Sequence, residues 1–402
     1  MWTLTGIAIR MGQRIGLHRD GVSLGLPPFE VEMRRRLWWQ ILLLDGRAAE
    51  LAGSGVSVLN NLSDTKPPLN VNDSELHPDM RDPPVEHTRP TEMLFCAMRY
   101  EFGKFLTSSK FTNAFDGHWQ TLSTTAAPVA DKDKAIDDLE ELLQQKYLKD
   151  CDLSIPLHEL TCVAAQAAIC RMRLTAHHPR QYAARGMQIP QNDRDMLFHN
   201  SLRIMEFDNI GRSKKAIQKF LWHVDNYFQW HSLIYLLSEL SCRFTGDEVD
   251  NAWRQIERIF EHHSQIINDT KRSLHVAICT LALKAYEARQ AYISRHNYAL
   301  PQGGPPRFIS SLYSRRNSRK TSFGLSSPSN GNSIINDYMG GEARPTDQQI
   351  GDDRPPSDFN NIFDPTFLTD PLVIDPSAIN WPEWDNLVQS FQWETAEGIM
   401  IS

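Results

Sequence analysis

The chain has 402 residues, of which 41% are hydrophobic and 23% are charged, and this ordinary globular usage predicts that most of the chain can bury a core. No apolar run approaches the ~18 residues that a membrane-spanning helix needs, and the N-terminus lacks a secretory signal pattern, so we expect a soluble, intracellular protein with no membrane partner. The net charge of −7 is uneven, because residues 331–402 carry 13 acidic and 2 basic side chains, which makes this end unsuited to docking on nucleic acid.

The first predicted element is an amphipathic helix at the N-terminus. Leu4, Ile7, Met11 and Ile15 recur at helical spacing, and Gly16 marks the expected end of the helix. Because a core buries the apolar face of such a helix, we expect these four side chains to point inward.

A second helix is predicted after Pro27 and Pro28, from the sequence FEVEMRRRLWWQILLLDGRAAELAG, with arginines on one face and Gly53 at its end. Its apolar positions are Val31, Leu37, Trp38, Ile41, Leu42, Leu44 and Leu51. A polar loop rich in proline then runs from Ser54 to about Pro90, where the prolines exclude long regular structure.

Helical periodicity continues through the rest of the body. The segment 132–149 has Ile136, Leu139, Leu143 and Tyr147 on one side. Further helices are predicted over about residues 91–105, 157–174, 217–243, 249–267 and 274–292. The segment 217–243 is apolar almost all round, which is typical of a single buried central helix. No stretch alternates with period two, so the predicted fold class is all-α.

The composition changes near residue 300. Residues 301–335 are rich in Gly, Pro, Ser and Asn, and they hold too little apolar material to offset the entropy of ordering, so we expect a disordered linker. Residues 336–402 form an acidic tail with interspersed aromatic side chains. The predicted organisation is therefore a helical domain over residues 1–300, a linker over 301–335 and an acidic-aromatic tail over 336–402.

Four sequence segments near the N-terminus occur in a specific order. They are RMGQRIGLHRDG, LPPFEVEMRRRLWW, LDGRAAELAGSG and SDTKPPLNVNDSELHPDM. This series resembles the middle homology region of fungal zinc-cluster transcription factors. The later segments WHVDNYFQWHSLIYLLSEL, AWRQIERIF and LALKAYEAR are similar to the rear helices of the same region. The resemblance covers about residues 1–293.

The resemblance implies a nuclear transcription regulator whose body is a regulatory module. Complete family members carry a six-cysteine cluster that binds two zinc ions upstream of this region and reads DNA. In this chain the cysteines are scattered and form no C-x-x-C pair, so we expect buried free thiols and no zinc or other cofactor in this chain. The segment also starts inside the homology region, which leaves two explanations: a truncated gene product, or a genuine regulator without its own DNA reader.

The arginine-rich second helix supplies the candidate site residues of the family motif. These are Arg34, Arg35, Arg36, Trp38, Trp39 and Asp45. We expect them to be structural, with Trp38 in the core and one or two arginines paired with Asp45, Glu32 or loop carbonyls. The alternative is a contact between the three arginines and DNA phosphates, which the neighbouring core-forming residues disfavour.

The sequence offers no constellation for catalysis. The adjacent pairs His177-His178 and His262-His263 point to different helix faces, so they make poor joint metal ligands. No nucleophile elbow, phosphate-binding glycine loop or zinc-protease helix is present. We therefore expect neither an enzyme nor a metal site.

The tail and the segment before it suggest interaction sites. The candidate activation contacts are Phe363, Phe367, Trp381, Trp384, Phe391 and Trp393. Acidic residues around aromatic ones are typical of a disordered activation segment that a coactivator groove accepts, while the alternative is that these aromatics dock on the helical body. The sequence SRRNSRKTS places a candidate phosphorylation site, Ser318, among basic residues that also resemble a nuclear-import signal.

The leading hypothesis is thus a nuclear regulator that controls a metabolic or secondary-metabolite pathway and contacts the transcription machinery or a coactivator through its tail. DNA is expected to be reached only indirectly or through an upstream module. The alternative is a protein that does not read DNA and that pairs with, or antagonises, complete regulators. A second copy of the chain is a further candidate partner.

Overall fold

The computed structural model of the chain describes residues 2–51, 63–107, 127–179, 189–297 and 304–323, together with residues 122, 182, 384 and 386–389. Over these residues the structure contains helices and no strands, which confirms the predicted all-α class. None of the helices in these ranges is long and apolar enough to cross a membrane.

Most of the described residues belong to ten longer helices. They are α1 (Trp2–Arg14), α2 (Pro28–Leu51), α3 (Leu94–Thr107), α5 (Val129–Leu143), α6 (Pro156–Ala176), α8 (Gln191–Ser213), α11 (Trp230–Leu240), α12 (Asp247–His262), α14 (Ser273–His296) and α15 (Arg307–Phe323). The short elements are η1 (Gly21–Leu24), η3 (Asp73–Glu75), η4 (Gln144–Leu148), α9 (Lys215–Gln218), α10 (Leu221–Val224), η5 (Asp225–Tyr227) and α13 (Gln265–Asn268).

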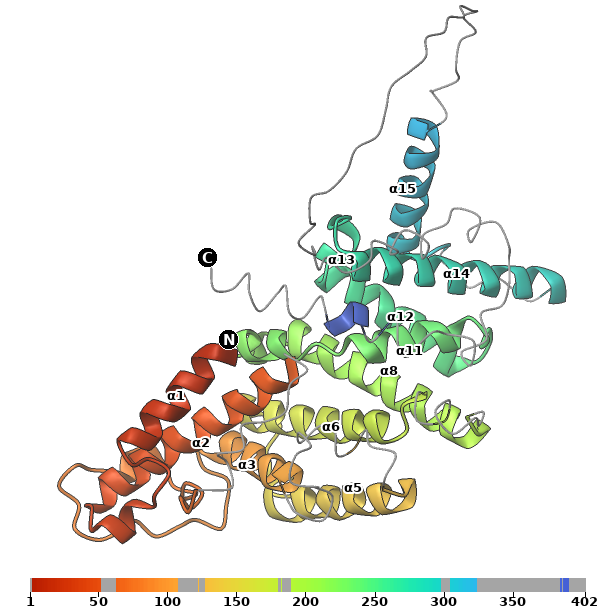
Figure 1. Cartoon of the computed structure of the whole chain (residues 1–402). Coiled ribbons are helices and arrows are strands. Elements are labelled where there is room, and N and C mark those ends of the chain that lie inside the picture. Colours follow the sequence, from red (N-terminus) through yellow and green to blue (C-terminus); the bar gives the residue numbers. More distant parts are fainter. Residues whose placement is uncertain are drawn as a thin grey trace, which may run out of the picture.

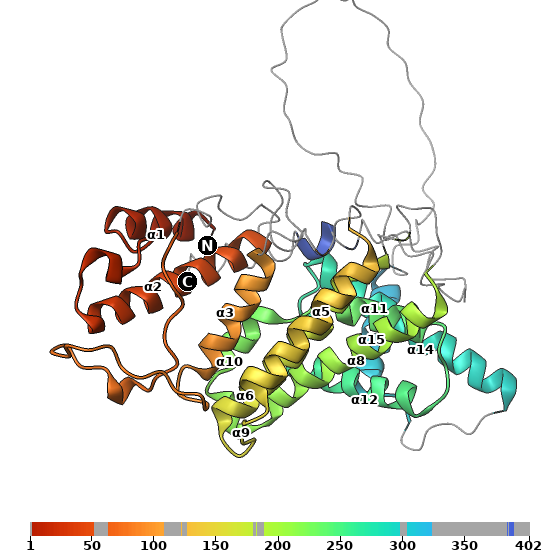
Figure 2. The same ribbon diagram turned by 90° about the horizontal axis from the view of Figure 1, so that it is seen from below.

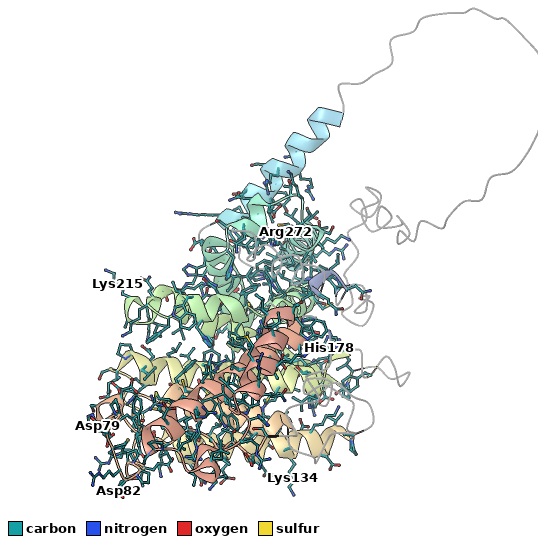
Figure 3. The ribbon with its side chains drawn as sticks, turned by 60° about the vertical axis from the view of Figure 1, so that its left-hand side comes forward. Asp79, Asp82, Lys134, His178, Lys215 and Arg272 are labelled. Carbon is teal, nitrogen blue, oxygen red and sulfur yellow. The ribbon has the colours of Figure 1, made fainter. Side chains whose placement is uncertain are left out.

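The longer helices stack in layers around α6 and α8. Helix α6 packs on α3 and α5 and also on α8, which in turn contacts α11 and α12 (Figure 1). Seen from below, α3, α5 and α6 lie side by side, and α1 and α2 form one end of the molecule (Figure 2). The loop that carries Asp79 and Asp82 lies at the opposite end from Arg272, which precedes α14 (Figure 3).

Two large apolar clusters hold these layers together. The main core joins α8, α11, α12, α14 and α15. The second core joins α3, α5 and α6, and it buries the predicted positions Ile136, Leu139, Leu143 and Tyr147, which confirms the periodicity of this segment. A small third cluster of Ile9, Leu17 and Trp38 connects α1 to α2.

The predicted apolar face of α1 is wrong. Leu4, Ile7, Met11 and Ile15 are 48–64% exposed, while α1 turns the face that carries Ile9 and Gly12 toward α2. The reason is steric, because a Cβ at Gly12 would lie only 3.1 Å from Cζ3 of Trp38, so the absence of a side chain lets the indole ring approach the helix. Gly16 does end the helix, as predicted, with a φ of 77°.

Part of the predicted apolar stripe of α2 is also exposed. Trp38 and Val31 are buried, but Leu37 and Leu44 are 51% and 44% exposed. The apolar pattern therefore placed the helix correctly and assigned some of its side chains to the wrong surface.

The single central helix predicted over residues 217–243 is interrupted. The chain forms α9, α10 and η5 before α11, and Phe228 and Gln229 have non-helical backbone angles where the helix was expected to continue. This break brings both Phe228 and Trp230 into the main core, with their ring centroids 4.6 Å apart. Helix α11 itself is buried, as expected.

The predicted linker contains a helix. Residues 307–323, within the expected disordered segment 301–335, form α15, and Phe308, Ile309 and Leu312 enter the main core. The rings of Phe308 and Phe260 stack with centroids 4.3 Å apart. These closely spaced apolar residues anchor one turn of an otherwise polar helix, a signal that the composition of the whole segment conceals.

Candidate functional site

Arg35 forms a buried ion pair at the junction of α1 and α2. Its Nε and Nη2 atoms donate to the two carboxylate oxygens of Asp20 at 2.8 and 2.9 Å, and the two side chains are 8% and 5% exposed. Asp20 also accepts hydrogen bonds from the Val22 and Lys66 amides, which fixes the start of η1 and the returning loop. Burial alone would raise the pKa of Asp20, but these hydrogen bonds outweigh it and hold the pKa below its ordinary value.

Arg36 connects α2 to the loop that follows it. It pairs with Glu32, one turn earlier, at 3.0 Å and with Asp73 of η3 at 2.6 Å. Glu32 is 1% exposed and also accepts the Leu69 amide, so burial raises its pKa despite the positive charge of Arg36. Arg34 donates to the Ile15 carbonyl just beyond α1.

The two tryptophans bind the same loop. Trp38 Nε1 donates to Ser63 Oγ at 2.7 Å, and Trp39 Nε1 donates to the Lys66 carbonyl at 3.0 Å. Thr65 Oγ1 donates to the Leu17 carbonyl at 2.7 Å, which closes the loop against the end of α1. The ordered sequence segments thus meet in one junction, formed by the end of α1, the first half of α2 and residues 63–76.

The arginines of the motif have some of the partners that the sequence suggested and some that it did not. Arg36 uses Glu32, which was among the expected partners, whereas the partners Asp20 and Asp73 were not foreseen. Asp45 accepts a hydrogen bond from Thr5 at 3.0 Å. Because Arg34, Arg35 and Arg36 are all engaged inside the chain, the geometry favours the structural role over a contact with DNA phosphates.

Beside the junction lies a cavity of about 490 Å³. It is lined by residues of α2, α3, α6 and α8 and of the short elements α10 and η5. Most of the lining is apolar, with Ala164, Ala167 and Ala168 of α6 leaving space that larger side chains would fill. Sequence reasoning missed this cavity because its lining comes from six elements, and the only local signal was the alanine-rich stretch of α6.

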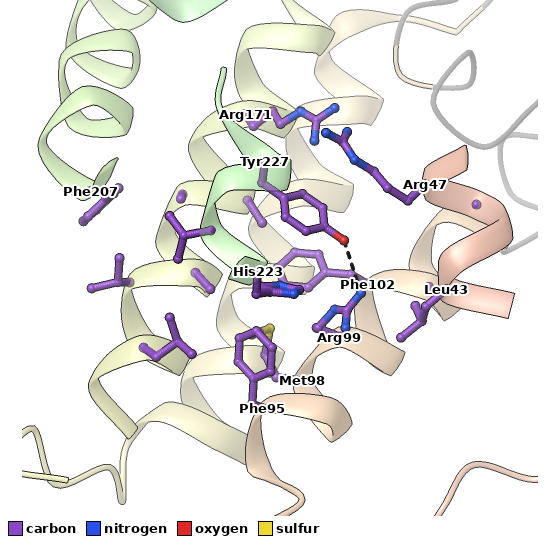
Figure 4. Close-up of a pocket in the computed structure, with 18 of the residues that line it drawn as sticks. Leu43, Arg47, Phe95, Met98, Arg99, Phe102, Arg171, Phe207, His223 and Tyr227 are labelled. Carbon is purple, nitrogen blue, oxygen red and sulfur yellow. Dashed lines mark hydrogen bonds between the residues drawn. The ribbon is translucent and has the colours of Figure 1, made fainter. Parts of the chain in front are cut away.

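Three arginines project into the cavity. The guanidinium groups of Arg47 and Arg171 point toward one another, and Arg99 donates to the hydroxyl of Tyr227 at 3.2 Å (Figure 4). The guanidinium of Arg47 also lies over the Tyr227 ring, 4.6 Å from its centroid. Burial lowers the pKa of Arg47 to about 10, and burial together with the charge of Arg47 lowers the pKa of Arg171 to about 9.

The described lining of the cavity also contains acidic and imidazole side chains. The one carboxylate there is Asp208, which already pairs with Arg212 at 3.0 Å and approaches His263 at 3.2 Å. His223 stands between the rings of Phe95 and Tyr227, and burial, with Arg99 and Arg47 nearby, lowers its pKa to about 4. The imidazole is therefore neutral at pH 7.

Part of the predicted tail contact is visible. Trp384 packs against the main core, and the neighbouring Leu387 and Val388 are 9% and 1% exposed within it. This contact agrees with the hypothesis that aromatics of the tail dock on the helical body. The other candidate contacts lie outside the described residues: Phe363, Phe367, Trp381, Phe391 and Trp393.

The candidate phosphorylation site lies on a helix and not in a linker. Ser318 belongs to α15, and the preceding Arg316 pairs with Glu287 of α14 at 2.7 Å. Arg315 donates to the Asn268 carbonyl at 3.4 Å. Two of the basic residues that suggested a nuclear-import signal are thus held on the body of the molecule.

The cysteines are free thiols, as predicted, and are partly rather than fully buried. Burial raises the pKa of Cys170 to about 11, so this thiol stays protonated at neutral pH. In the parts of the chain that the structure describes, no cluster of His, Cys, Asp and Glu has the geometry of a metal site.

Comparison with known proteins places this chain in a family. Residues 1–108 match the family model of the fungal specific transcription factor domain. The aurofusarin cluster transcription factor of Gibberella zeae is 39% identical over 76% of this chain and 45% of its own length. The pyriculol/pyriculariol biosynthesis cluster transcription factor 1 of Pyricularia oryzae is 31% identical over 73% of this chain and 40% of its own length.

Other relatives agree with these. A transcriptional regulator of Aspergillus aculeatus is 30% identical over 80% of this chain and 44% of its own length, and further relatives are C6 finger domain transcription factors. The matched regions span less than half the length of these curated relatives. No solved structure matches the chain. The helical body with its arginine–tryptophan junction therefore belongs to the fungal zinc-cluster (C6 finger) family of transcription factors, as a carrier of the fungal specific transcription factor domain.

Proposed function

We propose that this chain is the regulatory part of a nuclear transcription factor that controls a secondary-metabolite gene cluster. The observation that carries the proposal is the similarity to two named cluster regulators over 73–76% of the chain, which includes most of the helical body. The body supplies a helical domain, and its arginine motif serves the junction of α1, α2 and the loop. Catalysis has no part in the proposal, because the family consists of transcription regulators.

The tail is the proposed contact with the transcription machinery. Its aromatic residues stand among carboxylates, a composition that suits binding to a coactivator groove. The packing of Trp384, Leu387 and Val388 on the main core supports a second role, in which the body holds part of the tail and limits its access to partners. A released tail would then activate more strongly than a docked one.

A reporter assay tests both parts of this proposal. The full chain and residues 331–402 alone are each fused to an unrelated DNA-binding module that reads the reporter promoter. We expect activation from the tail alone and lower activation from the full chain. The double variant Leu387→Asp/Val388→Asp in the full chain should raise the output toward that of the tail, because charged side chains cannot remain in the main core.

The controls separate masking from loss of folding. The variant Ser311→Asp changes an exposed position of α15 and should leave the output of the full chain unchanged. Far-ultraviolet circular dichroism of each purified chain verifies that the helical body persists. A silent tail fusion would contradict the activation role, and equal output from tail and full chain would contradict the masking role.

The expectation that DNA is involved rests on the family alone. Complete members are expected to read DNA through a zinc cluster, so binding by this chain alone would be weak and sequence-independent. Pairing with a second copy, or with complete regulators, remains a prediction that size-exclusion chromatography with light scattering tests directly.

A further inference from the structure

The cavity between α2, α3, α6 and α8 is much larger than the voids of an ordinary helical core. Its volume is about 490 Å³, whereas packed protein interiors leave few voids bigger than a water molecule. This volume falls within the roughly 300–1,000 Å³ that is typical of sites for small molecules. The space is therefore large enough to hold a ligand.

Small residues keep this space open. Ala164, Ala167 and Ala168 of α6 line the cavity, and so do Gly46 of α2 and Gly103 of α3. A Cβ built at Gly46 would meet no atom of the described residues within 4 Å. Larger side chains at these positions would fill the space, so its size depends on the small residues that line it.

Much of the lining offers few partners to water. Leu42, Met98, Val163 and Ile204 contribute apolar side chains from α2, α3, α6 and α8. A water molecule inside a protein needs about two to four polar partners to replace the hydrogen bonds that it makes in bulk water. An apolar molecule that displaces such water gains free energy, because its surface is buried against these side chains.

Aromatic side chains form one connected part of the lining. The ring of His223 contacts the rings of Phe95 and Tyr227, with 5.1 and 4.8 Å between the centroids. Phe102 also lines the cavity. Aromatic rings attract one another in offset-stacked and edge-on arrangements by more than the burial of their area provides. This part of the lining therefore favours a flat aromatic molecule over a saturated molecule of the same size.

The arginines of the lining are engaged within the chain. Arg99 donates to the Tyr227 hydroxyl at 3.2 Å, and the guanidinium of Arg47 lies over the Tyr227 ring. Arg47 and Arg171 also have further interactions within the chain. A charged ligand would lose its hydration on entry and would compete with these contacts, so the lining favours an uncharged one.

We infer that this cavity binds a flat, uncharged aromatic molecule, which lies against Phe95, Phe102, His223 and Tyr227. The inference goes beyond the proposed function and does not rest on it, because it depends on the lining of the cavity and not on where the chain acts. A ligand held there would contact α2, α3, α6 and α8 together and would stabilise the folded chain.

Two fluorescent probes test the charge of the ligand. N-phenyl-1-naphthylamine is uncharged, and 8-anilinonaphthalene-1-sulfonate has the same rings with an added sulfonate. Titrated into the full chain at pH 7.5, the uncharged probe should bind at least about tenfold more tightly than the sulfonate, because only the sulfonate must lose the hydration of a charge.

Displacement of the bound uncharged probe tests the aromatic character. 2-Naphthol and decahydro-2-naphthol have the same carbon skeleton and hydroxyl group, and only the first is aromatic. 2-Naphthol should displace the probe at a severalfold lower concentration, because the saturated compound lacks the ring contacts with the lining.

A space-filling variant tests the location. Gly46→Leu should fill the cavity and abolish binding of the uncharged probe, whereas Gly46→Ala adds a single carbon at the same position and should retain it. A second control, Gly6→Leu, adds a side chain to open space on α1, outside this cavity, and should also retain binding. All three variants replace a helical glycine by a better helix former, so they should melt at or above the temperature of the unmodified chain.

The outcomes distinguish the inference from nonspecific dye binding. Loss of the uncharged probe in Gly46→Leu alone, together with a probe-induced rise in melting temperature that Gly46→Leu lacks, supports it. Equal or tighter binding of the sulfonate would overturn the uncharged class, and equal displacement by the two naphthols would overturn the aromatic class. Absence of probe binding, binding that persists in Gly46→Leu, or a Gly46→Leu chain that melts below Gly6→Leu would overturn the site itself.

Discussion

At the scale of single residues, buried charges explain how the junction of α1 and α2 is held. Asp20 binds one arginine and two backbone amides, so a single carboxylate fixes α2, η1 and the returning loop. Arg36 does the same for α2 and η3 through Glu32 and Asp73. Asp20, Arg35 and Glu32 carry charge where the surroundings exclude water, so each of these three side chains depends on its partner.

Substitution of Arg35 should show this dependence. Arg35→Met leaves Asp20 buried without its counter-charge and should lower the free energy of unfolding by about 3–5 kcal/mol. Urea denaturation of the purified chain measures the change, with Arg10→Met as the exposed control, which should stay within about 0.5 kcal/mol. If Arg35→Met matched the control, the ion pair would not hold the junction.

His223 should make the stability depend on pH. Burial lowers its pKa from the ordinary 6.5 to about 4, so between these values the unfolded chain binds a proton that the folded chain does not. The contribution of the neutral His223 to the free energy of unfolding is therefore complete above pH 6.5 and is lost as the pH falls toward 4. After allowance for solvent screening it amounts to about 1–3 kcal/mol.

The comparison of the unmodified chain with His223→Gln isolates this effect. Urea denaturation at pH 7.5, 6.5, 5.5 and 5.0 should show a stability difference between the two proteins that shrinks as the pH falls. A difference that stayed constant across this range would show that the imidazole titrates as it does in water.

At the scale of elements, helices α5 and α1 show what sequence patterns can and cannot predict. In α5 the predicted positions Ile136, Leu139 and Leu143 are buried, although the charged Lys132 is buried beside them. In α1 the pattern failed, because the contact of Gly12 with Trp38 decides which side faces α2. Such a contact depends on a residue 26 positions away, which no local periodicity reports.

Helix α15 tests whether the segment after residue 300 belongs to the folded body. Phe308→Ala removes a ring that stacks on Phe260 in the main core and should lower the free energy of unfolding by about 3–5 kcal/mol. Ser311→Ala, at an exposed position of the same helix, should change it by less than about 0.5 kcal/mol. A disordered linker would instead tolerate both substitutions equally, as thermal or urea denaturation would reveal.

The cavity and the tail contact show a second limit of the sequence. Arg47, Arg99 and Arg171 are separated by 52 and 72 positions, and they meet only because α2, α3 and α6 pack together. In contrast, the order of the motif segments around the junction was sufficient to identify the family. The sequence predicted docking of the tail as an alternative to activation, but it could not indicate that Leu387 and Val388 make the contact.

At the scale of the whole molecule, the structure combines three parts with separable roles. The junction of α1 and α2 belongs to the family domain, the layered helices enclose a largely apolar cavity that three arginines line, and Trp384, Leu387 and Val388 pack on the main core. Helix α8 connects two of these parts, because it lines the cavity and contributes to the main core.

The central claim is that this chain controls the expression of a secondary-metabolite gene cluster. The most direct measurement is the transcript profile of the fungus that encodes it, compared between the intact strain, a strain with the gene deleted and a strain with the gene restored. We predict that a linked set of biosynthetic genes changes severalfold on deletion and returns on restoration. A profile in which no such set responds would contradict the claim.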